Sequence, residues 1–255
     1  MTMASHQDLI LDQFTRQAVP FATAPSIKDE QALRLVIEFC GAGPDDTVLD
    51  VACGPGILAC AFARVVRHAT GIDITPAMLD RARALQREQG LTNLTWQQGD
   101  VLPLPFPAAS FTIVTSRFAF HHFLEPRRVL AEMKRVCAPG GKVVVVDSAP
   151  ARDKADAFNR MERLRDPSHT RALPPEEHVD LFAAVGLPAP RTTGYHLDSD
   201  LEGLLKRSFP NPGDDETIRQ LFVASLADDA LGIRTRREGD VIRCHYPVAV
   251  LVAER

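Results

Sequence analysis

Val48-Leu49-Asp50-Val51-Ala52-Cys53-Gly54-Pro55-Gly56 is the stretch that decides the fold of this chain. An apolar strand pattern leads into a glycine-rich turn, and residues 57–66 have the apolar pattern of a helix that follows it. Glycine lets a backbone approach a ligand that a Cβ atom would exclude, and the first turn of a helix offers unpaired N–H groups. Because open α/β sheets bind ligands at such strand ends, the stretch predicts a nucleotide-like cofactor.

The glycine-rich turn by itself leaves two kinds of cofactor open. Residues 54–59, Gly-Pro-Gly-Ile-Leu-Ala, satisfy the dinucleotide pattern G-x-G-x-x-G/A. Asp73 follows about 20 residues later, where a dinucleotide site has its ribose-binding acid. An NAD(P)-dependent oxidoreductase is therefore one hypothesis.

Composition narrows the class of protein. The chain has 255 residues, of which 45% are hydrophobic, and a net charge of −4. Its length suits one large domain with a cap, or at most two domains, and the acidic balance argues against a nucleic-acid partner. Its apolar runs are too short for a membrane span, and we recognise no secretory signal.

Five cysteines without a C-x-x-C pair argue against a disulfide framework and a zinc site, so we expect a cytoplasmic protein without a bound metal. The oligomeric state stays open, a homodimer included.

Strand and helix patterns alternate along the chain, which predicts a mostly parallel α/β sheet with helices on both faces. Seven strands are expected, at residues 47–52, 69–74, 94–98, 111–115, 142–147, 191–197 and 241–253. Residues 1–41 are expected to form an N-terminal helical lid and residues 42–255 the cofactor-binding domain. Substrate-cap segments are expected near residues 151–175 and 198–239.

Three acids beside the predicted strand ends separate the two kinds of cofactor. A carboxylate at Asp50 would repel a pyrophosphate at the helix N-terminus, and it suits a ligand with an ammonium group. Asp73 can accept hydrogen bonds from ribose hydroxyls in either cofactor. Asp100, after Gly99, can accept from the amino group of adenine. These acids favour a cationic nucleoside that carries an amino acid.

Four stretches in this order resemble the class I S-adenosylmethionine (SAM)-dependent methyltransferases. The stretches are VLDVACGPG, GIDITPAMLDRA, QQGDVLPLPFPAASFTIVTS and EMKRVCAPGGKVVVVD, within roughly Ala42 to Asp147. They are most similar to the ubiquinone and menaquinone biosynthesis C-methyltransferases of the methyltransferase type 11 family. The resemblance implies a Rossmann-like, seven-stranded sheet with an antiparallel last strand and helical cap insertions. It also implies methyl transfer from SAM to a small-molecule acceptor, at carbon or oxygen rather than nitrogen, with S-adenosylhomocysteine as product.

The resemblance assigns roles to individual residues. It puts Gly54 and Gly56 at the methionine end of SAM, Asp73 at the ribose and Asp100 at the adenine. The family often has glycine where this chain has Ala52, a small change that should affect SAM binding little. The expected cofactor site comprises Asp50, Ala52, Cys53, Gly54, Gly56, Asp73, Ile74, Met78, Gly99, Asp100, Val101 and Ser116.

His121 and His122 follow the predicted fourth strand at the cofactor edge. Either ring can act as a general base, because histidine titrates near neutral pH. The alternative is that one ring packs in the core and the other caps a short helix. The quinone enzymes usually have Arg-Asn in this segment, so the histidine pair argues against a quinone acceptor.

Substrate contacts are expected from Arg117, Phe118 and His169, and Arg165 and Asp166 are further candidates. The alternatives are a surface salt bridge for Arg117, core packing for Phe118 and a solvated loop for residues 163–171.

Phe14 and Phe21 are expected in the N-terminal lid. Residues 115–118, Thr-Ser-Arg-Phe, stand where methyltransferases of nucleic-acid amino groups have Asn/Asp-Pro-Pro-aromatic. This difference argues against a nucleic-acid base as the acceptor. A protein that binds SAM without methyl transfer remains a further alternative.

Overall fold

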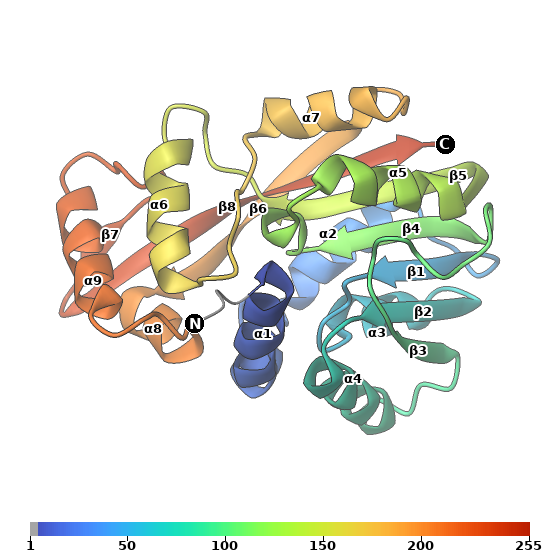
Figure 1. Cartoon of the computed structure of the whole chain (residues 1–255), viewed down its shortest axis with the longest axis horizontal. Coiled ribbons are helices and arrows are strands. Elements are labelled where there is room, and N and C mark those ends of the chain that lie inside the picture. Colours follow the sequence, from blue (N-terminus) through green and yellow to red (C-terminus); the bar gives the residue numbers. More distant parts are fainter. Residues whose placement is uncertain (1–4) are drawn as a thin grey trace.

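A twisted sheet runs through the computed structural model, which describes residues 5–255 (Figure 1). The first four residues of the predicted lid lie outside the described residues. The strand order is β3-β2-β1-β4-β5-β8-β6, and β7 pairs with β8. The strands are β1 (Thr47–Val51), β2 (His68–Asp73), β3 (Leu94–Gln98), β4 (Phe111–Arg117), β5 (Cys137–Ser148), β6 (Arg191–Asp200), β7 (Arg236–Glu238) and β8 (Val241–Glu254).

The seven predicted strands are all present, and the expected Rossmann-like α/β fold is confirmed. The central pairs are parallel, whereas β8 runs antiparallel to β5, β6 and β7. The short strand β7 is an eighth strand that the sequence pattern did not predict. Its three residues are charged and exposed, so it shows no alternation of apolar and polar positions. Pairing with the longer strand β8 makes it a strand.

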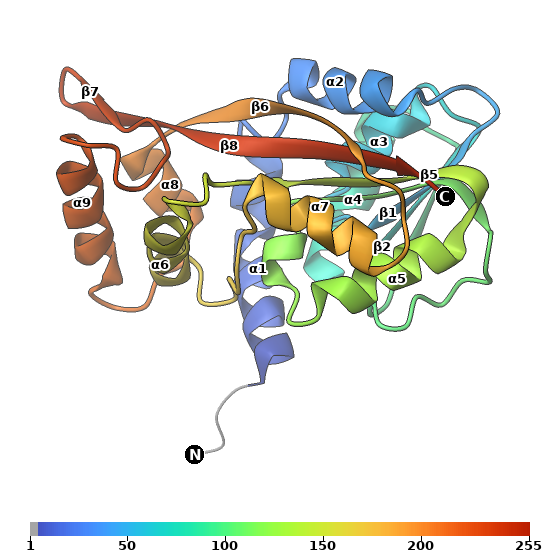
Figure 2. The same ribbon diagram turned by 90° about the horizontal axis from the view of Figure 1, so that it is seen from above.

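Helices cover both faces of the sheet, as Figure 2 shows for α2 and α3 on one face and α5 and α7 on the other. The helices are α1 (His6–Thr23), α2 (Glu30–Cys40), α3 (Ile57–Ala63), α4 (Pro76–Glu88), α5 (Pro126–Val136), α6 (Ala155–Arg165), α7 (Pro175–Ala184), α8 (Leu201–Arg207) and α9 (Asp214–Ser225), with the 3₁₀ helix η1 (Phe120–His122). Among the described residues, none of the helices combines the length and the apolar character that a membrane span requires.

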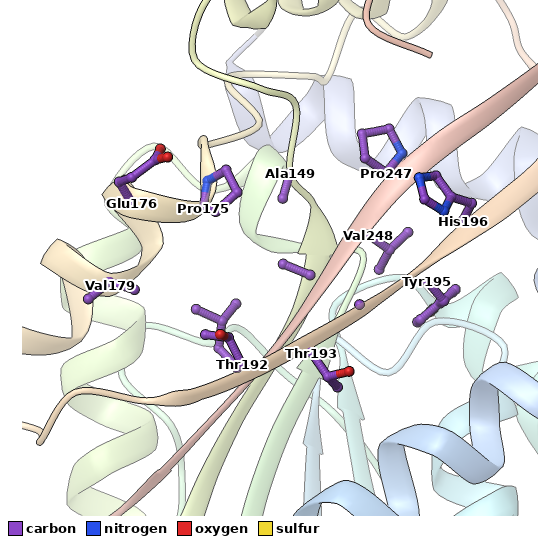
Figure 3. Close-up of a pocket in the computed structure, with 13 residues that line it drawn as sticks. Ala149, Pro175, Glu176, Val179, Thr192, Thr193, Tyr195, His196, Pro247 and Val248 are labelled. Atoms are coloured by element: carbon purple, nitrogen blue, oxygen red, sulfur yellow. The ribbon is translucent and has the colours of Figure 1, made fainter. Parts of the chain in front are cut away.

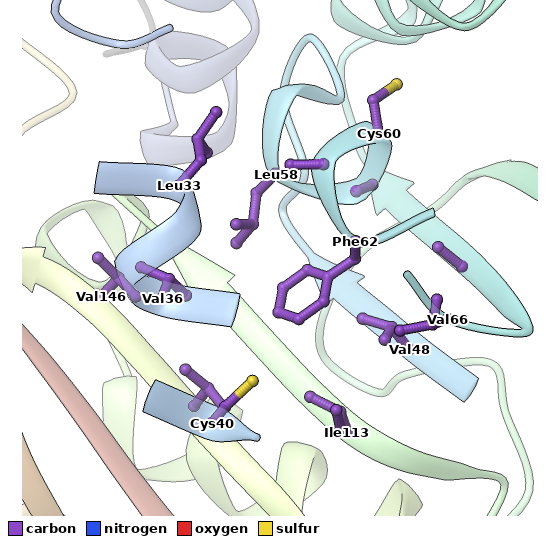
Figure 4. Close-up of a cluster of buried hydrophobic side chains, with 14 of the residues drawn as sticks. Leu33, Val36, Cys40, Val48, Leu58, Cys60, Phe62, Val66, Ile113 and Val146 are labelled. Carbon is purple, nitrogen blue, oxygen red and sulfur yellow. The ribbon is translucent and has the colours of Figure 1, made fainter. Parts of the chain in front are cut away.

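The consecutive valines of β5 contribute to two hydrophobic cores. Val144 and Val146 pack with α2 and α3, and Val143 and Val145 pack with α5 and α7. Figure 4 shows the first core, in which Phe62 of α3 lies among side chains of α2 and the sheet. Burial on both faces explains why the four consecutive valines, Val143 to Val146, do not alternate with polar residues.

We expect Phe62→Ala to lower the free energy of unfolding by about 3–5 kcal/mol, because removing this fully buried ring leaves a cavity in the core. Urea denaturation followed by circular dichroism measures the change. Val65→Ala is the control, since Val65 is 40% exposed. Equal stability losses in the two variants would contradict this assignment of the core.

A third hydrophobic core lies in the part of the molecule formed by α6, α8, α9 and the first residues of β8. Phe158 of α6, Phe222 of α9 and Tyr246 of β8 belong to it, and α8 packs on it. In Figure 1 this part lies on one side of α1, and α4 lies on the other. The helix α1 contacts both α4 and α8, so it bridges the sheet and the added helices.

Candidate active site

A cavity of about 400 Å³ lies at the carboxyl ends of the parallel strands, against α1. It gathers residues that follow β1, β2, β3 and β4, since parallel strands end at the same edge of a sheet. Phe14 and Phe21 of α1 complete its wall. The expected cofactor residues that line this first cavity are Ala52, Cys53, Gly54, Asp73, Ile74, Met78, Asp100 and Val101.

The turn after β1 is held against the end of β2 by Asp73. The backbone N–H of Gly54 donates to Asp73 Oδ2, and that of Thr75 donates to Oδ1, both at 2.8 Å. Gly54 has a φ of 52°, and a Cβ there would meet only Met78 Sδ, at 4.0 Å. Burial raises the pKa of Asp73, and these backbone hydrogen bonds oppose the shift. An ionised carboxylate has lone pairs beyond the two engaged here, so Asp73 can also accept from ribose hydroxyls.

Four expected cofactor residues do not line the first cavity: Gly56, Gly99, Ser116 and Asp50, of which Asp50 lies in a recess described below. A Cβ on Gly56 would stand 2.5 Å from the ring of Trp96 and 2.8 Å from Ala82, so helix packing demands this glycine. Gly99 donates its N–H to the Asp73 carbonyl at 3.0 Å. Ser116 Oγ donates to the Val51 carbonyl at 2.9 Å. In the structure, Gly56 lets the start of α3 pack against Trp96 and Ala82, and Gly99 and Ser116 hydrogen-bond to the ends of β2 and β1.

Asp50 lies in a recess of about 20 Å³ that it shares with Cys53 and Arg117. The carboxylate is 1% exposed, and within residues 5–255 neither oxygen has a hydrogen-bond partner. Burial raises the pKa of Asp50 to about 7, although the charge of Arg117 opposes the shift. A buried carboxylate without a partner is costly, so this recess suits a ligand that brings a positive donor.

The guanidinium of Arg117 supplies hydrogen-bond donors to the same recess. Its Nη1 donates to the Ile27 carbonyl at 3.1 Å and its Nε to the Tyr195 hydroxyl at 3.3 Å. The buried Nη2 has no partner in the part of the chain that the structure describes. A carboxylate acceptor and a guanidinium donor therefore line one recess. This pair matches the ammonium and carboxylate of an amino acid.

The two adjacent histidines have different partners. His121 Nδ1 lies 2.5 Å from Asp147 Oδ1, and its backbone N–H donates to Asp147 Oδ2 at 2.9 Å. Burial disfavours the charged ring, but Asp147 outweighs it and raises the pKa of His121. The same contact lowers the pKa of Asp147, despite its burial. His121 is therefore held beside a carboxylate, and its imidazolium form is favoured.

His122 is held in the opposite protonation state. Its Nδ1 lies 3.1 Å from both the carbonyl and the Oγ of Ser168. Ser168 Oγ donates its own proton to Asp166 Oδ1 at 2.6 Å, so the proton between the ring and the serine belongs to His122 Nδ1. Nε2 then carries a lone pair. Burial and the charge of His121 lower the pKa of His122 to about 4, which keeps the ring neutral at pH 7.

A second cavity of about 110 Å³ adjoins the first. Phe14, Phe21, Phe118 and His122 line both, so His122 stands where the two cavities meet. Sequence reasoning missed several polar residues of the second cavity. They come from α1, α6, β5, β6, α8 and β8 and are Gln17, Ser148, Glu162, Ser199, Arg207 and Tyr246.

The expected substrate residues lie in three different places. Phe118 lines both cavities, and Arg117 lines only the first cavity and the Asp50 recess. Arg165 and Asp166 line the second cavity. His169 lines neither cavity, because it is buried behind His121 with a ring separation of 5.3 Å. Its Nε2 lies 2.7 Å from the Asn159 side-chain oxygen, and burial strongly lowers its pKa.

A surface groove of about 420 Å³ lies apart from these cavities, along β6 and β8 (Figure 3). Its wall is mainly apolar, with Val179, Tyr195 and Val248 among its residues. The groove shares no residue with the first cavity, and it holds none of the expected site residues. We therefore place the chemistry in the two adjoining cavities.

Comparison with known proteins identifies the family. A sequence profile described as a methyltransferase domain matches residues 49–145. The chain is 33% identical over 219 residues to YcgJ of Bacillus subtilis, described as an uncharacterized methyltransferase, and the match covers 85% of this chain and 86% of that protein. The crystal structure of YcgJ superimposes with a TM-score of 0.80 and 28% identity, over 88% of this chain and 98% of that one.

Two further relatives have names that state an acceptor. "Probable tocopherol O-methyltransferase, chloroplastic" of rice is 31% identical over 173 residues, which are 60% of this chain and 47% of that protein. The ubiquinone/menaquinone biosynthesis C-methyltransferase UbiE of Shewanella halifaxensis is 36% identical over 125 residues, which are 47% of this chain and 50% of that protein. The matches span about half the length of these two relatives. The oxidoreductase hypothesis is excluded, because the chain belongs to the SAM-dependent methyltransferase family.

Proposed function

We propose that this methyltransferase methylates a small molecule at carbon or oxygen, in the second cavity, with His122 as the general base. The observation that carries the proposal is the position of His122, a neutral ring that lines both cavities. The size of the second cavity, about 110 Å³, supports a small acceptor over a nucleic acid. The tocopherol and quinone relatives support carbon or oxygen as the acceptor atom.

The residues of the first cavity fit SAM. Asp50 and Arg117 would hold the ammonium and carboxylate of its methionine part, and Asp73 its ribose. Asp100 Oδ1 accepts from the Leu102 N–H at 3.1 Å, which leaves Oδ2 for the adenine amino group. Arg117 thus becomes a cofactor residue in this proposal, not a substrate residue.

SAM, when bound, supplies a methyl group that its positive sulfur makes electrophilic. Methyl transfer would join the methyl carbon to the acceptor atom and break the C–S bond, whose electron pair would return to sulfur to give S-adenosylhomocysteine. The proton of the acceptor passes to His122 Nε2. The Ser168–Asp166 hydrogen-bond chain behind the ring would stabilise the resulting imidazolium. Although burial opposes it, the charge of Arg165 and the hydrogen bonds from Ser168 and Gln17 lower the pKa of Asp166 and favour its ionised form.

His121 has a different role in this proposal. Its Nδ1 is committed to Asp147, and its raised pKa makes it a poor base at neutral pH. Its positive charge also lowers the pKa of His122. Two titratable groups whose environments separate their pKa values are typical of an acid–base pair. We therefore assign proton acceptance to His122 alone.

We propose that α1 acts as a lid and that the cap comprises residues 151–175 and 198–239. The side chain of His6 contacts the His122 carbonyl at 2.7 Å. Gln17 Nε2 donates to Asp166 Oδ2 at 3.0 Å. These contacts join α1 to the segments that carry the base and the second cavity, so α1 is placed to cover both cavities, as a lid would be.

Binding of SAM is the first test. Calorimetry of the purified protein with SAM, and with S-adenosylhomocysteine as the unreactive ligand, should give measurable affinities. Methyl transfer is then screened by mass spectrometry with panels of small carbon, oxygen and nitrogen acceptors. Transfer to nitrogen acceptors alone, or to nucleic acid alone, would overturn the proposal.

We expect the affinity for S-adenosylhomocysteine to fall as the pH falls below about 7. The pKa of Asp50 in the free protein is raised to about 7, so the carboxylate attracts the ligand ammonium above that pH and loses its charge below it. The dissociation constant should rise by up to about tenfold per pH unit. Calorimetry from pH 5.5 to 8 measures this change.

Asp50→Asn should bind S-adenosylhomocysteine more weakly and without this pH dependence. Asp45→Asn is the control, since Asp45 is exposed near the start of β1. A pH dependence that persists in Asp50→Asn would show that another group titrates.

A further inference from the structure

Arg207 is a cation of the second cavity without an acidic partner. It ends α8, is half-buried and donates from Nη2 to Ser199 Oγ at 2.8 Å. Within residues 5–255 no carboxylate forms an ion pair with it. Asp200, the acid that acts on it most, accepts the Gly203 N–H at 2.7 Å as the N-cap of α8. Burial lowers the pKa of Arg207, since the charge is incompletely compensated.

The acids of the second cavity are already engaged. Glu162 pairs with Arg165 at 2.6 Å and accepts from the Tyr246 hydroxyl at 2.8 Å. Asp166 accepts from Ser168 Oγ at 2.6 Å and from Gln17 Nε2 at 3.0 Å. Glu162 is thus paired with a cation, and Asp166 is held by two neutral donors. Arg207 is the cation of this cavity that no carboxylate within residues 5–255 pairs, so its charge is open to an anionic ligand.

The rest of the wall suits a short apolar body. Phe21, Ile27, Phe118, Leu197 and Leu204 line the same cavity. An engineered apolar cavity of about 150 Å³ holds benzene, and this cavity is smaller, about 110 Å³. It therefore suits a short chain, or a small ring that reaches into the adjoining first cavity. A ligand in it meets an apolar wall, the base His122 and Arg207, whereas the other cations, Arg165 and His121, are paired with Glu162 and Asp147.

We propose that the methyl acceptor is a small organic carboxylic acid whose carboxylate pairs with Arg207. Its apolar body contacts Phe118 and Leu204, and its reacting atom faces His122 at the junction with the first cavity. A guanidinium and a carboxylate form charge-assisted, often bidentate hydrogen bonds, and a half-buried site strengthens them. This inference rests on the proposed function and names the substrate class of the same site.

The test compares acids with amides of the same shape. Benzoate, phenylacetate and cinnamate are each paired with their amide and titrated by calorimetry into protein saturated with S-adenosylhomocysteine. The wild type should bind at least one acid about tenfold or more tightly than its amide, because hydrogen bonds to charged groups contribute about 1.5–3 kcal/mol. Arg207→Met should lose this preference, and Arg207→Lys should restore part of it.

Lys206→Met is the matched control, since Lys206 is exposed on the same helix and does not line the cavity. It should keep the preference of the wild type. If no acid is preferred over its amide in the wild type, or if Arg207→Met keeps the preference, the inference fails. Thermal melting of each variant confirms that it is folded.

The binding of S-adenosylhomocysteine separates this inference from the proposed function. Arg207→Met should bind it as the wild type does, because Arg207 lies outside the first cavity. A wild type that binds S-adenosylhomocysteine but prefers no acid refutes the acceptor class alone. A wild type that does not bind it refutes the cofactor site and the function with it.

Discussion

His122→Gln is expected to lower kcat by roughly 10²–10⁴-fold, the usual contribution of a general base. Glutamine keeps a similar size and a polar end, but it has no basic nitrogen to accept the proton. The affinity for S-adenosylhomocysteine should change less than about threefold, because other residues hold that ligand. Steady-state kinetics with an acceptor from the screen, together with calorimetry, measures both quantities.

His196→Gln is the control for this substitution. His196 lies on β6 beside the surface groove (Figure 3) and lines neither active-site cavity. Its kcat should equal that of the wild type. A His122→Gln enzyme with near-normal kcat would rule out His122 as the base.

The pH profile of kcat provides a second readout for the base. A pKa lowered to about 4 leaves His122 neutral and competent above that pH, and protonation removes the base as the pH falls through about 4. An ordinary exposed histidine would lose activity near its usual pKa of about 6.5. With SAM saturating, so that the Asp50 effect on binding is removed, kcat should stay level between pH 6 and 8.

Asp73→Ala is expected to weaken the binding of S-adenosylhomocysteine by roughly 100-fold or more. It removes a charged acceptor for two ribose hydroxyls, each contributing about 1.5–3 kcal/mol. It also frees the N–H groups of Gly54 and Thr75, which Asp73 holds at 2.8 Å. Calorimetry at pH 8 measures the loss.

Asp80→Ala is the control for Asp73→Ala, since Asp80 lies on α4 with a side chain 74% exposed. It should bind S-adenosylhomocysteine like the wild type. Asp73→Asn separates charge from shape, because it keeps one oxygen acceptor and should lie between the wild type and Asp73→Ala. A dissociation constant for Asp73→Ala within threefold of the wild-type value would contradict the ribose role.

Much of the cofactor site could be predicted from the sequence because its signals are local. The strand that ends near Asp50, the turn at Gly54 and the acid Asp73 each lie within a few residues of a strand end. Parallel strands bring such ends to one edge, so the order of motifs along the chain predicts which residues meet. The packing of Gly56 has no such local signal, because its neighbour Trp96 lies 40 positions away in sequence.

The chemistry of the histidine pair could not be predicted from the sequence. His121 and His122 are adjacent in the chain, yet their pKa values shift in opposite directions. Asp147, on β5, raises the pKa of His121 against its burial, whereas burial and the charge of His121 lower the pKa of His122. A pKa depends on charges and burial contributed by the whole fold.

The second cavity shows most clearly what local sequence patterns determine and what tertiary packing decides. The sequence by itself determined the seven strands, the glycine-rich turn and the acid after β2 that we propose for SAM, because periodicity and turn chemistry act over a few residues. Only the tertiary structure brought Arg207, Glu162 and Tyr246 into one cavity. These residues come from α8, α6 and β8 and share no local pattern, so their charge balance, and with it the acceptor class we propose, arises from long-range packing.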